Sequence, residues 1–464
     1  MLAIPFLILS FICGAWMLSR ELKRRPGMSK ALWIPTLLVA ILGSRSVSHW
    51  LEGANSGTAN SPLDEAFFVF VLGGSFLIAT SKGVNWGKFL GSNLPLLLVY
   101  AYFALSIFWS DAPFDSAKRI VKDFGLLFVV AAVLSEKKPR EAVRAIFIRC
   151  ACFIFPVSLV CNHYFPSIAR GFGLDGSMML TGVTEQKNTL GEVVFVFSTM
   201  IAWDYLERRQ LPGMTLKRAL RVDQIVLLAI GIILLLQSQS KTALISVLIC
   251  FGLSFRPRRF ASRSSNLSVM FVSLSVPILV FFTQRFGEII QPLVEALGRD
   301  MTFTGRTAIW EHITLQTVNP ILGCGYWNFW AGPGGKAISE AIHWPIPNAH
   351  CGYLDIYLDG GMCGLILLSI FLVSYGFRLA GKVARSPFQL VRLGLFAAAI
   401  VYNQSESSFF RLGLLWFTTL LMIVSFPMKQ RRPVSILPPA IEDEEYAGQR
   451  QDHVTAFAGI AQRS

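Results

Sequence analysis

Long apolar runs recur along this chain of 464 residues and constrain its fold more than any other feature. Hydrophobic residues make up 53% of the sequence and charged residues only 15%, whereas soluble domains carry about 25% charged residues. A membrane-spanning helix needs about 20 mostly apolar residues, so several of the runs must extend into their flanks. The runs therefore predict an all-α polytopic membrane protein with about 12 to 14 transmembrane helices.

Most of the 42 basic residues fall in alternate loops between the apolar runs. Basic loops of membrane proteins face the cytoplasm. The net charge of +14 therefore reflects membrane topology and does not indicate nucleic acid binding. With about 13 spans, this alternation places the N-terminus outside and the C-terminus inside.

A polar segment of residues 283–360 interrupts the apolar pattern and divides the chain. We expect residues 1–282 to hold about ten transmembrane helices and residues 361–428 to hold the remaining spans. The charge pattern places 283–360 on the outer side, and residues 429–464 form a cytoplasmic tail whose composition predicts disorder. Long connections are either functional or disordered, and the outer segment is too rich in aromatic residues for disorder. We therefore expect the protein's chemistry there.

Two residues of the outer segment are the first candidates for catalysis. Arg306 follows Thr304 and Gly305, either of which could cap a helix, and an arginine in a first helical turn is unfavourable unless it binds an anion. Its fork of donors suits a phosphate, although a salt bridge to Asp300 would also explain it. His350 precedes the next apolar run and is suited to proton transfer near neutral pH, or is simply an interfacial residue.

Further cations lie at the predicted outer ends of membrane helices. Lys241 stands between two apolar runs without a Gly or Pro turn, so it belongs to a tight connection or to a break in one long helix, at membrane depth. Lys187 and Asn188 precede another run and either anchor that helix or bind phosphate. Lys118 and Arg119 lie beside each other at a helix start, which is either a solvated amphipathic turn or part of an anion site.

Other residues of the outer segment suit a binding site for sugars. Tyr326 and Trp327 offer flat faces for sugar rings, or form part of an interfacial aromatic belt. Cys324 and Cys351 could form a disulfide in an oxidising compartment, but sequence cannot supply the geometry. Neither metal-ligand spacing nor a Walker lysine motif is present, so we expect no metal site and no ATP-driven pump.

Together these residues resemble the O-antigen ligase and polymerase superfamily of bacterial polysaccharide assembly, and most of all its exopolysaccharide polymerases of the succinoglycan type. The resemblance covers roughly residues 90–430, and its most specific mark is a His followed, after a small polar residue and nine more, by Gly-x-x-Gly. In this chain Cys351 stands where the family more often has Asn, Ser or Gln. The marks are Trp109-Ser110-Asp111, Gln186-Lys187-Asn188-Thr189-Leu190-Gly191, Ser238-Gln239-Ser240-Lys241-Thr242, Gly305-Arg306-Thr307-Ala308-Ile309-Trp310, Pro320-Ile321-Leu322-Gly323-Cys324-Gly325, and His350-Cys351 with Gly361-Met362-Cys363-Gly364.

The resemblance implies an enzyme of the bacterial inner membrane whose active site faces the periplasm. Its substrate would be an oligosaccharide linked to undecaprenyl diphosphate, and the enzyme would lie in the lipid bilayer. Its chemistry would need no cofactor, because the lipid diphosphate is the leaving group. Fixed cations would stabilise the departing diphosphate. We expect Lys241 and Arg306 to be these cations, and Lys187, Lys118 and Arg119 are weaker candidates. His350 would accept the proton of the acceptor hydroxyl, with Asp355 in reserve.

Three functions remain open at this stage. A polymerase would join lipid-linked repeat units into exopolysaccharide, with a chain-length-regulating copolymerase and a flippase as candidate partners. A ligase would move a finished glycan onto a lipid A core or another acceptor. A transporter or flippase of polysaccharide or lipid would need charges in mid-helix and often an internal repeat, and the sequence shows no repeat.

Overall fold

The computed structural model describes residues 3–53, 61–173, 176–285, 306–381 and 386–426. These residues are almost entirely helical, and the strands among them form one antiparallel pair, β1 (Arg170–Phe172) with β2 (Met178–Leu180). The all-α fold class is therefore confirmed. The predicted tail, residues 429–464, lies outside the described residues.

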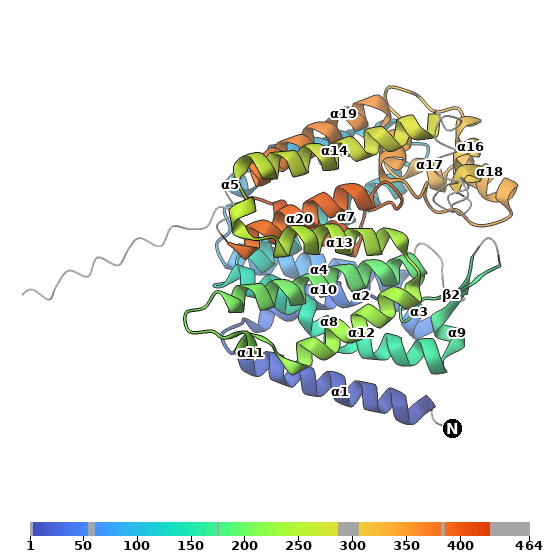
Figure 1. Ribbon diagram of the computed structural model, residues 1–464. Helices are drawn as coiled ribbons and strands as arrows, with labels where there is room; N and C mark the ends of the chain where they lie inside the picture. Colours follow the sequence, from blue (N-terminus) through green and yellow to red (C-terminus); the bar gives the residue numbers. More distant parts are fainter. Residues whose placement is uncertain (1–2, 54–60, 174–175, 286–305, 382–385, 427–464) are drawn as a thin grey trace, which may run out of the picture. The chain divides into compact units, whose positions relative to one another are not determined.

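The helices before the outer segment form most of the bundle drawn in Figure 1. In chain order they are α1 (Ala3–Arg24), α2 (Trp33–Leu42), α3 (Val47–Glu52), α4 (Pro62–Ser81), α5 (Trp86–Gly91), α6 (Leu94–Leu105), α7 (Pro113–Leu134), α8 (Pro139–Tyr164), α9 (Pro166–Ala169), α10 (Lys187–Arg209), α11 (Leu216–Ala219), α12 (Val222–Ser238), α13 (Lys241–Phe255) and α14 (Arg263–Arg285).

The remaining helices belong to the outer segment and to the C-terminal part of the bundle. They are α16 (Arg306–Thr314), α17 (Asn328–Ala331), α18 (Pro333–Ile342), α19 (Gly352–Ala380), α20 (Pro387–Tyr402) and α21 (Leu414–Ile423). Short 3-10 turns cover Lys30–Leu32, Ser106–Trp109 and Arg258–Phe260.

Five helices among the described residues are long and apolar enough to cross a membrane, namely α1, α4, α8, α10 and α19. The predicted polytopic membrane protein is confirmed, and the total number of spans stays a prediction. Only 17% of the apolar window of α1 is buried, against 78% for α8 and for α10. Helices buried all round lie inside a bundle, whereas an apolar exposed helix such as α1 suits contact with lipid.

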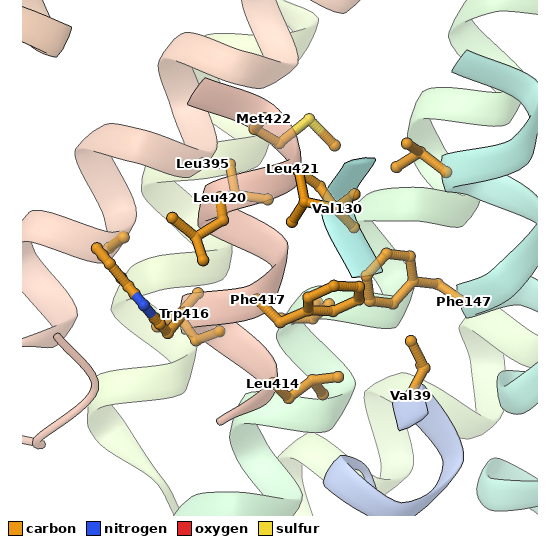
Figure 2. Close-up of a cluster of buried hydrophobic side chains, with 14 of the residues drawn as sticks. Val39, Val130, Phe147, Leu395, Leu414, Trp416, Phe417, Leu420, Leu421 and Met422 are labelled. Carbon is orange, nitrogen blue, oxygen red and sulfur yellow. The ribbon is translucent and has the colours of Figure 1, made fainter. Parts of the chain in front are cut away.

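The centre of the bundle is α21, whose ten residues are all buried. Figure 2 shows its side chains, among them Trp416 and Phe417, beside Val39 of α2, Val130 of α7 and Phe147 of α8. A helix of ten residues is about 15 Å long, half the thickness of a bilayer core, so α21 does not cross the membrane alone. Its neighbours enclose it instead.

The outer segment has a small apolar core of its own. Ile309 and Ile313 of α16, Ile338 of α18, and Phe329 and Trp330 of α17 are buried together. At least two of its aromatic residues, Phe329 and Trp330, therefore belong to a folded core. The helix α14 continues to Arg285, three residues past the predicted boundary between residues 282 and 283, and that boundary stays a prediction.

At its other end the outer segment joins the bundle through a break within α19. Gly361 is non-helical, with φ +59° and ψ −156°, so the predicted boundary between residues 360 and 361 coincides with this break. The segment 320–325 crosses the break: Cys324 donates its N–H to Leu358 at 2.9 Å, and Met362 donates to Pro320 at 2.9 Å. The Pro320–Gly325 motif and the Gly361-x-x-Gly364 motif are thus two sides of one backbone crossing.

Candidate active site

Glu406 gathers side chains from three separate parts of the chain. One carboxylate oxygen lies 2.6 Å from Nη2 of Arg306 and accepts a 2.6 Å hydrogen bond from the amide of Asn188. The other lies 3.4 Å from Nδ1 of His350. We call these four residues the Glu406 cluster. Only 8% of Glu406 is exposed, so this carboxylate is held by its partners and not by water.

The loop of residues 403–413, between α20 and α21, carries Glu406 and is itself largely buried. A buried loop must satisfy its own backbone groups. The side chain of Asn403 does so by accepting the N–H groups of Ser408 and Phe409 at 2.8 and 2.9 Å. The loop therefore has a fixed shape, and Glu406 has a fixed direction.

The same loop holds the entry to α19, where His350 lies. Gly352 donates its N–H to the carbonyls of Asn403 and Glu406 at 2.8 and 3.1 Å. A Cβ atom at position 352 would overlap Oδ1 of Asn403, so only glycine permits this approach. Two residues earlier, His350 is in the left-handed region with φ +50°, and its N–H donates to Asn348. This backbone turns the imidazole toward Glu406.

The imidazole of His350 has one ring nitrogen near Glu406 and one remaining for a substrate. If Nδ1 carries the proton and donates to the carboxylate, Nε2 is unprotonated and can accept a proton. About a fifth of the side chain is exposed, so a reactant can reach it. The geometry suits a general base oriented by a carboxylate.

Lys241 and Lys187 begin two helices that meet beside this loop. Only residues 239 and 240 separate α12 from α13, so the tight connection, one of the two alternatives predicted from the sequence, is present. Gln239 has a left-handed backbone with φ +52°, and the side chain of Ser240 caps α13. Thr242, next to Lys241, contacts Ser405 with 2.6 Å between the hydroxyl oxygens.

Packing between the helix starts brings the second lysine to the same place. A Cβ at Gly191 of α10 would lie 2.7 Å from Cβ of Ala243 and 2.8 Å from that of Ser240, so the first turns of α10 and α13 touch. Lys187 and Lys241 are the first residues of these helices. The positive ends of the α10 and α13 dipoles thus border the loop that carries Glu406, and each of these helices begins with a lysine.

Arg306 opens α16, as the sequence predicts for the first turn of a helix. Residues 300, 304 and 305, named for its salt bridge and its cap, lie outside the described residues. Its carboxylate partner in the structure is Glu406, 100 residues further along the chain. A carboxylate partner thus exists, but it belongs to the site itself.

Two residues that the sequence predicted for the site, Tyr326 and Asp355, are buried and hold the protein's own structure together, so their predicted roles are corrected. Tyr326 is only 1% exposed, and its hydroxyl donates to Asp123 at 2.6 Å and to the carbonyl of Phe410, so its ring cannot stack on a sugar. Asp355 is also 1% exposed, and accepts from Nε1 of Trp330 at 2.7 Å and from the N–H of Ala349 at 3.0 Å. That carboxylate holds the segment before His350 and is too enclosed to act as the reserve base.

Lys118, Arg119 and Trp327 form a separate group. Lys118 lies 2.8 Å from Glu65 of α4, and the guanidinium carbon of Arg119 lies 4.2 Å from the ring centre of Trp327. None of the three contacts a member of the Glu406 cluster by a hydrogen bond or ion pair among the described residues. The structure therefore divides the predicted substrate-binding residues into two places.

Cys324 and Cys351 are free thiols in this structure, so the disulfide left open by the sequence is absent from the described residues. Burial raises the pKa of each thiol to about 11. Both thiols are therefore protonated near neutral pH and act as small packing groups.

Sequence reasoning missed Glu406 and the loop 403–413 completely. A signal was present: residues 403–408 are all polar and include Glu406, Arg411 follows closely, and the stretch joins two apolar runs on the predicted outer side. A carboxylate and a guanidinium in a short outer loop deserve the same weight as Lys241.

Two comparisons with known proteins show what this chain is similar to. The family profile described as O-antigen ligase matches residues 225–369, from α12 into α19, a range that contains Lys241, Arg306 and His350. The chain is also 26% identical over 391 residues to the exopolysaccharide production protein ExoQ of Rhizobium meliloti (strain 1021), covering 77% of this chain and 83% of that protein.

Both findings support the resemblance to the O-antigen ligase and polymerase superfamily. With the membrane helices, they support a multi-pass membrane protein with a polysaccharide ligase or polymerase type of function. The profile ends before Glu406, whose place in the site comes from the structure alone.

Proposed function

Taking the O-antigen ligase and polymerase superfamily as the premise, we propose that this protein polymerises oligosaccharide repeat units linked to undecaprenyl diphosphate. The product is an exopolysaccharide, formed at the periplasmic face of the inner membrane. The observation that carries the proposal is the convergence of Arg306, His350 and Asn188 on Glu406, beside the helix start that bears Lys241.

The reaction transfers a sugar from one lipid-linked chain to another. The oxygen of an acceptor hydroxyl forms a bond to C1 of the donor sugar, while the bond from C1 to the diphosphate oxygen breaks. The lipid diphosphate leaves with the electron pair, and the hydroxyl proton passes to Nε2 of His350. Nδ1 of His350 donates its hydrogen to the carboxylate of Glu406. The negative charge of Glu406 then stabilises the imidazolium that forms.

Negative charge develops on the departing diphosphate and needs fixed positive partners. Arg306 offers a planar fork of donors, and Lys241 and Lys187 add charge at two helix starts. The single negative charge of Glu406 balances only one of these three cations, so the site keeps a net positive charge that can bind the diphosphate. Such preorganised charge acts mainly on the transition state.

A deletion strain with complementing variants tests this function. We expect loss of high-molecular-weight polysaccharide and accumulation of single lipid-linked repeat units. Arg306→Gln and His350→Gln should reproduce the deletion while the protein remains in the membrane at its usual level, and Arg209→Gln, at the exposed end of α10, should behave as wild type. A normal polysaccharide profile in both site variants would remove the two residues from the mechanism.

The second candidate is a ligase, which the matching O-antigen ligase profile favours. The same cluster would serve it, because the donor and the bond that breaks are the same. The deletion strain separates the two, since a ligase defect leaves chains of normal length on the lipid carrier.

A further inference from the structure

A second polar pocket lies away from the Glu406 cluster. It has a volume of about 210 Å³, and most of its wall comes from the first turns of α7. Trp327 of the outer segment and Leu412 of the loop 403–413 close it. The lining residues are Asp115, Lys118, Arg119, Lys122, Asp123, Trp327 and Leu412. We call it the α7 pocket, and it shares no lining residue with the Glu406 cluster.

Two cations of the α7 pocket have no carboxylate within ion-pair distance among the residues that the structure describes. Arg119 lies against the ring of Trp327, and Lys122 lies 5.4 Å from the ring centre of Phe68 in α4. Lys118 is matched by Glu65 at 2.8 Å. Aromatic rings hold the cations in place without neutralising them.

The acids of the pocket are engaged elsewhere or lie at the helix start. Asp123 accepts the hydroxyl of Tyr326 at 2.6 Å, deep in the bundle, and Asp115 lies in the first turn of α7. Nε1 of Trp327 is enclosed and has no acceptor among the described residues. Arg119, Lys122 and this indole therefore present donors for an oxygen-rich anion.

The surface beside the pocket is apolar and suits contact with lipid. Phe114 and Val121 are exposed, and with Lys118 they follow the i, i+4, i+7 spacing that puts residues on one face of a helix. Exposed apolar side chains continue on α4, which packs along α7 and carries Val69 and Leu77. An anion bound in the pocket can thus carry a hydrocarbon chain along this face.

Polymerisation requires two lipid-linked chains at once, and this requirement rests on the function proposed above. The donor loses its diphosphate at the catalytic centre. The acceptor keeps its own diphosphate at the end of the oligosaccharide opposite the hydroxyl that reacts. The acceptor's diphosphate therefore needs a place separate from the catalytic cations. We propose that the α7 pocket binds the diphosphate of the lipid-linked acceptor, through Arg119 and Lys122.

Binding of the lipid carrier tests the number of sites directly. The full-length protein is placed in nanodiscs of phosphatidylcholine, and undecaprenyl diphosphate is titrated while native mass spectrometry counts the bound molecules. We expect two per chain for wild type and one for the Arg119→Gln/Lys122→Gln variant. The matched control, Lys88→Gln/Arg209→Gln, changes two exposed cations in α5 and α10 and should keep two.

Activity toward two acceptors distinguishes this role from a structural one. With the lipid-linked repeat unit as acceptor, Arg119→Gln/Lys122→Gln should raise KM about a hundredfold, since each of the two lost charge-assisted bonds is worth about a factor of ten. With the same oligosaccharide freed of its lipid diphosphate, the variant and wild type should react equally. Arg119→Lys/Lys122→Arg should retain most of the binding.

Three outcomes would overturn the proposal. The first is two carriers still bound to the glutamine variant, and the second is an equal loss of rate with the lipid-free acceptor. The third is displacement of the second carrier by phosphatidylglycerol at the same mole fraction, which would make the pocket a general site for anionic lipid headgroups. The function proposed above fails separately, through normal polysaccharide in Arg306→Gln and His350→Gln.

Discussion

At the scale of single residues, Glu406 explains why side chains from α10, α16 and the start of α19 lie together. A carboxylate between a guanidinium and an imidazole fixes both, and leaves each with a free edge for a substrate. Gly352 makes this arrangement possible, because its missing side chain lets the backbone touch Asn403.

Gly352→Ala should separate His350 from Glu406, because the new methyl group overlaps the amide of Asn403. We expect about 1–3 kcal/mol of destabilisation, typical of overpacking, and a lower transfer rate. Thermal unfolding of the purified protein measures the first and a transfer assay the second. Gly252→Ala in α13, where a Cβ meets nothing within 4 Å, is the control and should be neutral or slightly stabilising.

At the scale of elements, the break in α19 shows how the outer segment is tied to the membrane bundle. The segment 320–325 supplies hydrogen bonds to the backbone on both sides of Gly361. The crossing needs a residue that tolerates a positive φ and has no side chain, which explains the first glycine of the Gly-x-x-Gly pattern after His350.

Gly361→Ala tests this crossing. A Cβ there would overlap the carbonyl group of Ile321 and would require the left-handed backbone that alanine avoids. We expect a loss of about 2 kcal/mol or more, seen as a lower midpoint of thermal unfolding. Gly73→Ala in α4 meets nothing within 4 Å, and should leave the midpoint unchanged or raise it slightly. An unchanged midpoint for both variants would contradict this account of the crossing.

The same scale shows what could be predicted from the sequence. Lys241, Arg306 and His350 stood out because charged residues are rare near apolar runs. The structure brings Arg306 and His350 to Glu406, and it places Thr242, next to Lys241, against Ser405 of the same loop. Glu406 was missed because its polar loop was not weighed with the other outer charges, and only the folded chain shows that this loop turns inward. Tyr326 and Asp355 were misjudged because sequence does not say which polar side chain serves the interior.

At the scale of the whole molecule, a buried ion network stabilises the end of the bundle opposite the outer segment. Asp204 of α10 lies 2.6 Å from Arg25 and 3.1 Å from Arg144, and accepts from Gln224 at 2.9 Å. Removing one member of a buried network leaves the others uncompensated.

Asp204→Ala should therefore cost about 3–5 kcal/mol and lower the amount of folded protein in the membrane. The thermal midpoint in detergent is the measurement. Arg209→Ala, an exposed change five residues further along α10, should leave the midpoint where it was. A stable Asp204→Ala protein would mean that the network is held by other contacts.

The charge pattern also predicts the orientation of the whole bundle. Ala337→Cys in α18 should react with a membrane-impermeant maleimide in intact spheroplasts, because the charge pattern predicts that the outer segment faces the periplasm. Gln210→Cys, after α10, should react only in permeabilised membranes. The reverse pattern of labelling would invert the topology and remove the site from the periplasm.

A double-mutant cycle between Glu406 and His350 tests the central claim, that the Glu406 cluster acts as one unit. The measurement is the transfer rate of purified Glu406→Gln, His350→Gln and the double variant with a lipid-linked donor. Both single variants should lose about a hundredfold or more, and the double variant should lose hardly more than His350→Gln alone. A wild-type rate for Glu406→Gln, or losses that multiply in the double variant, would contradict the account.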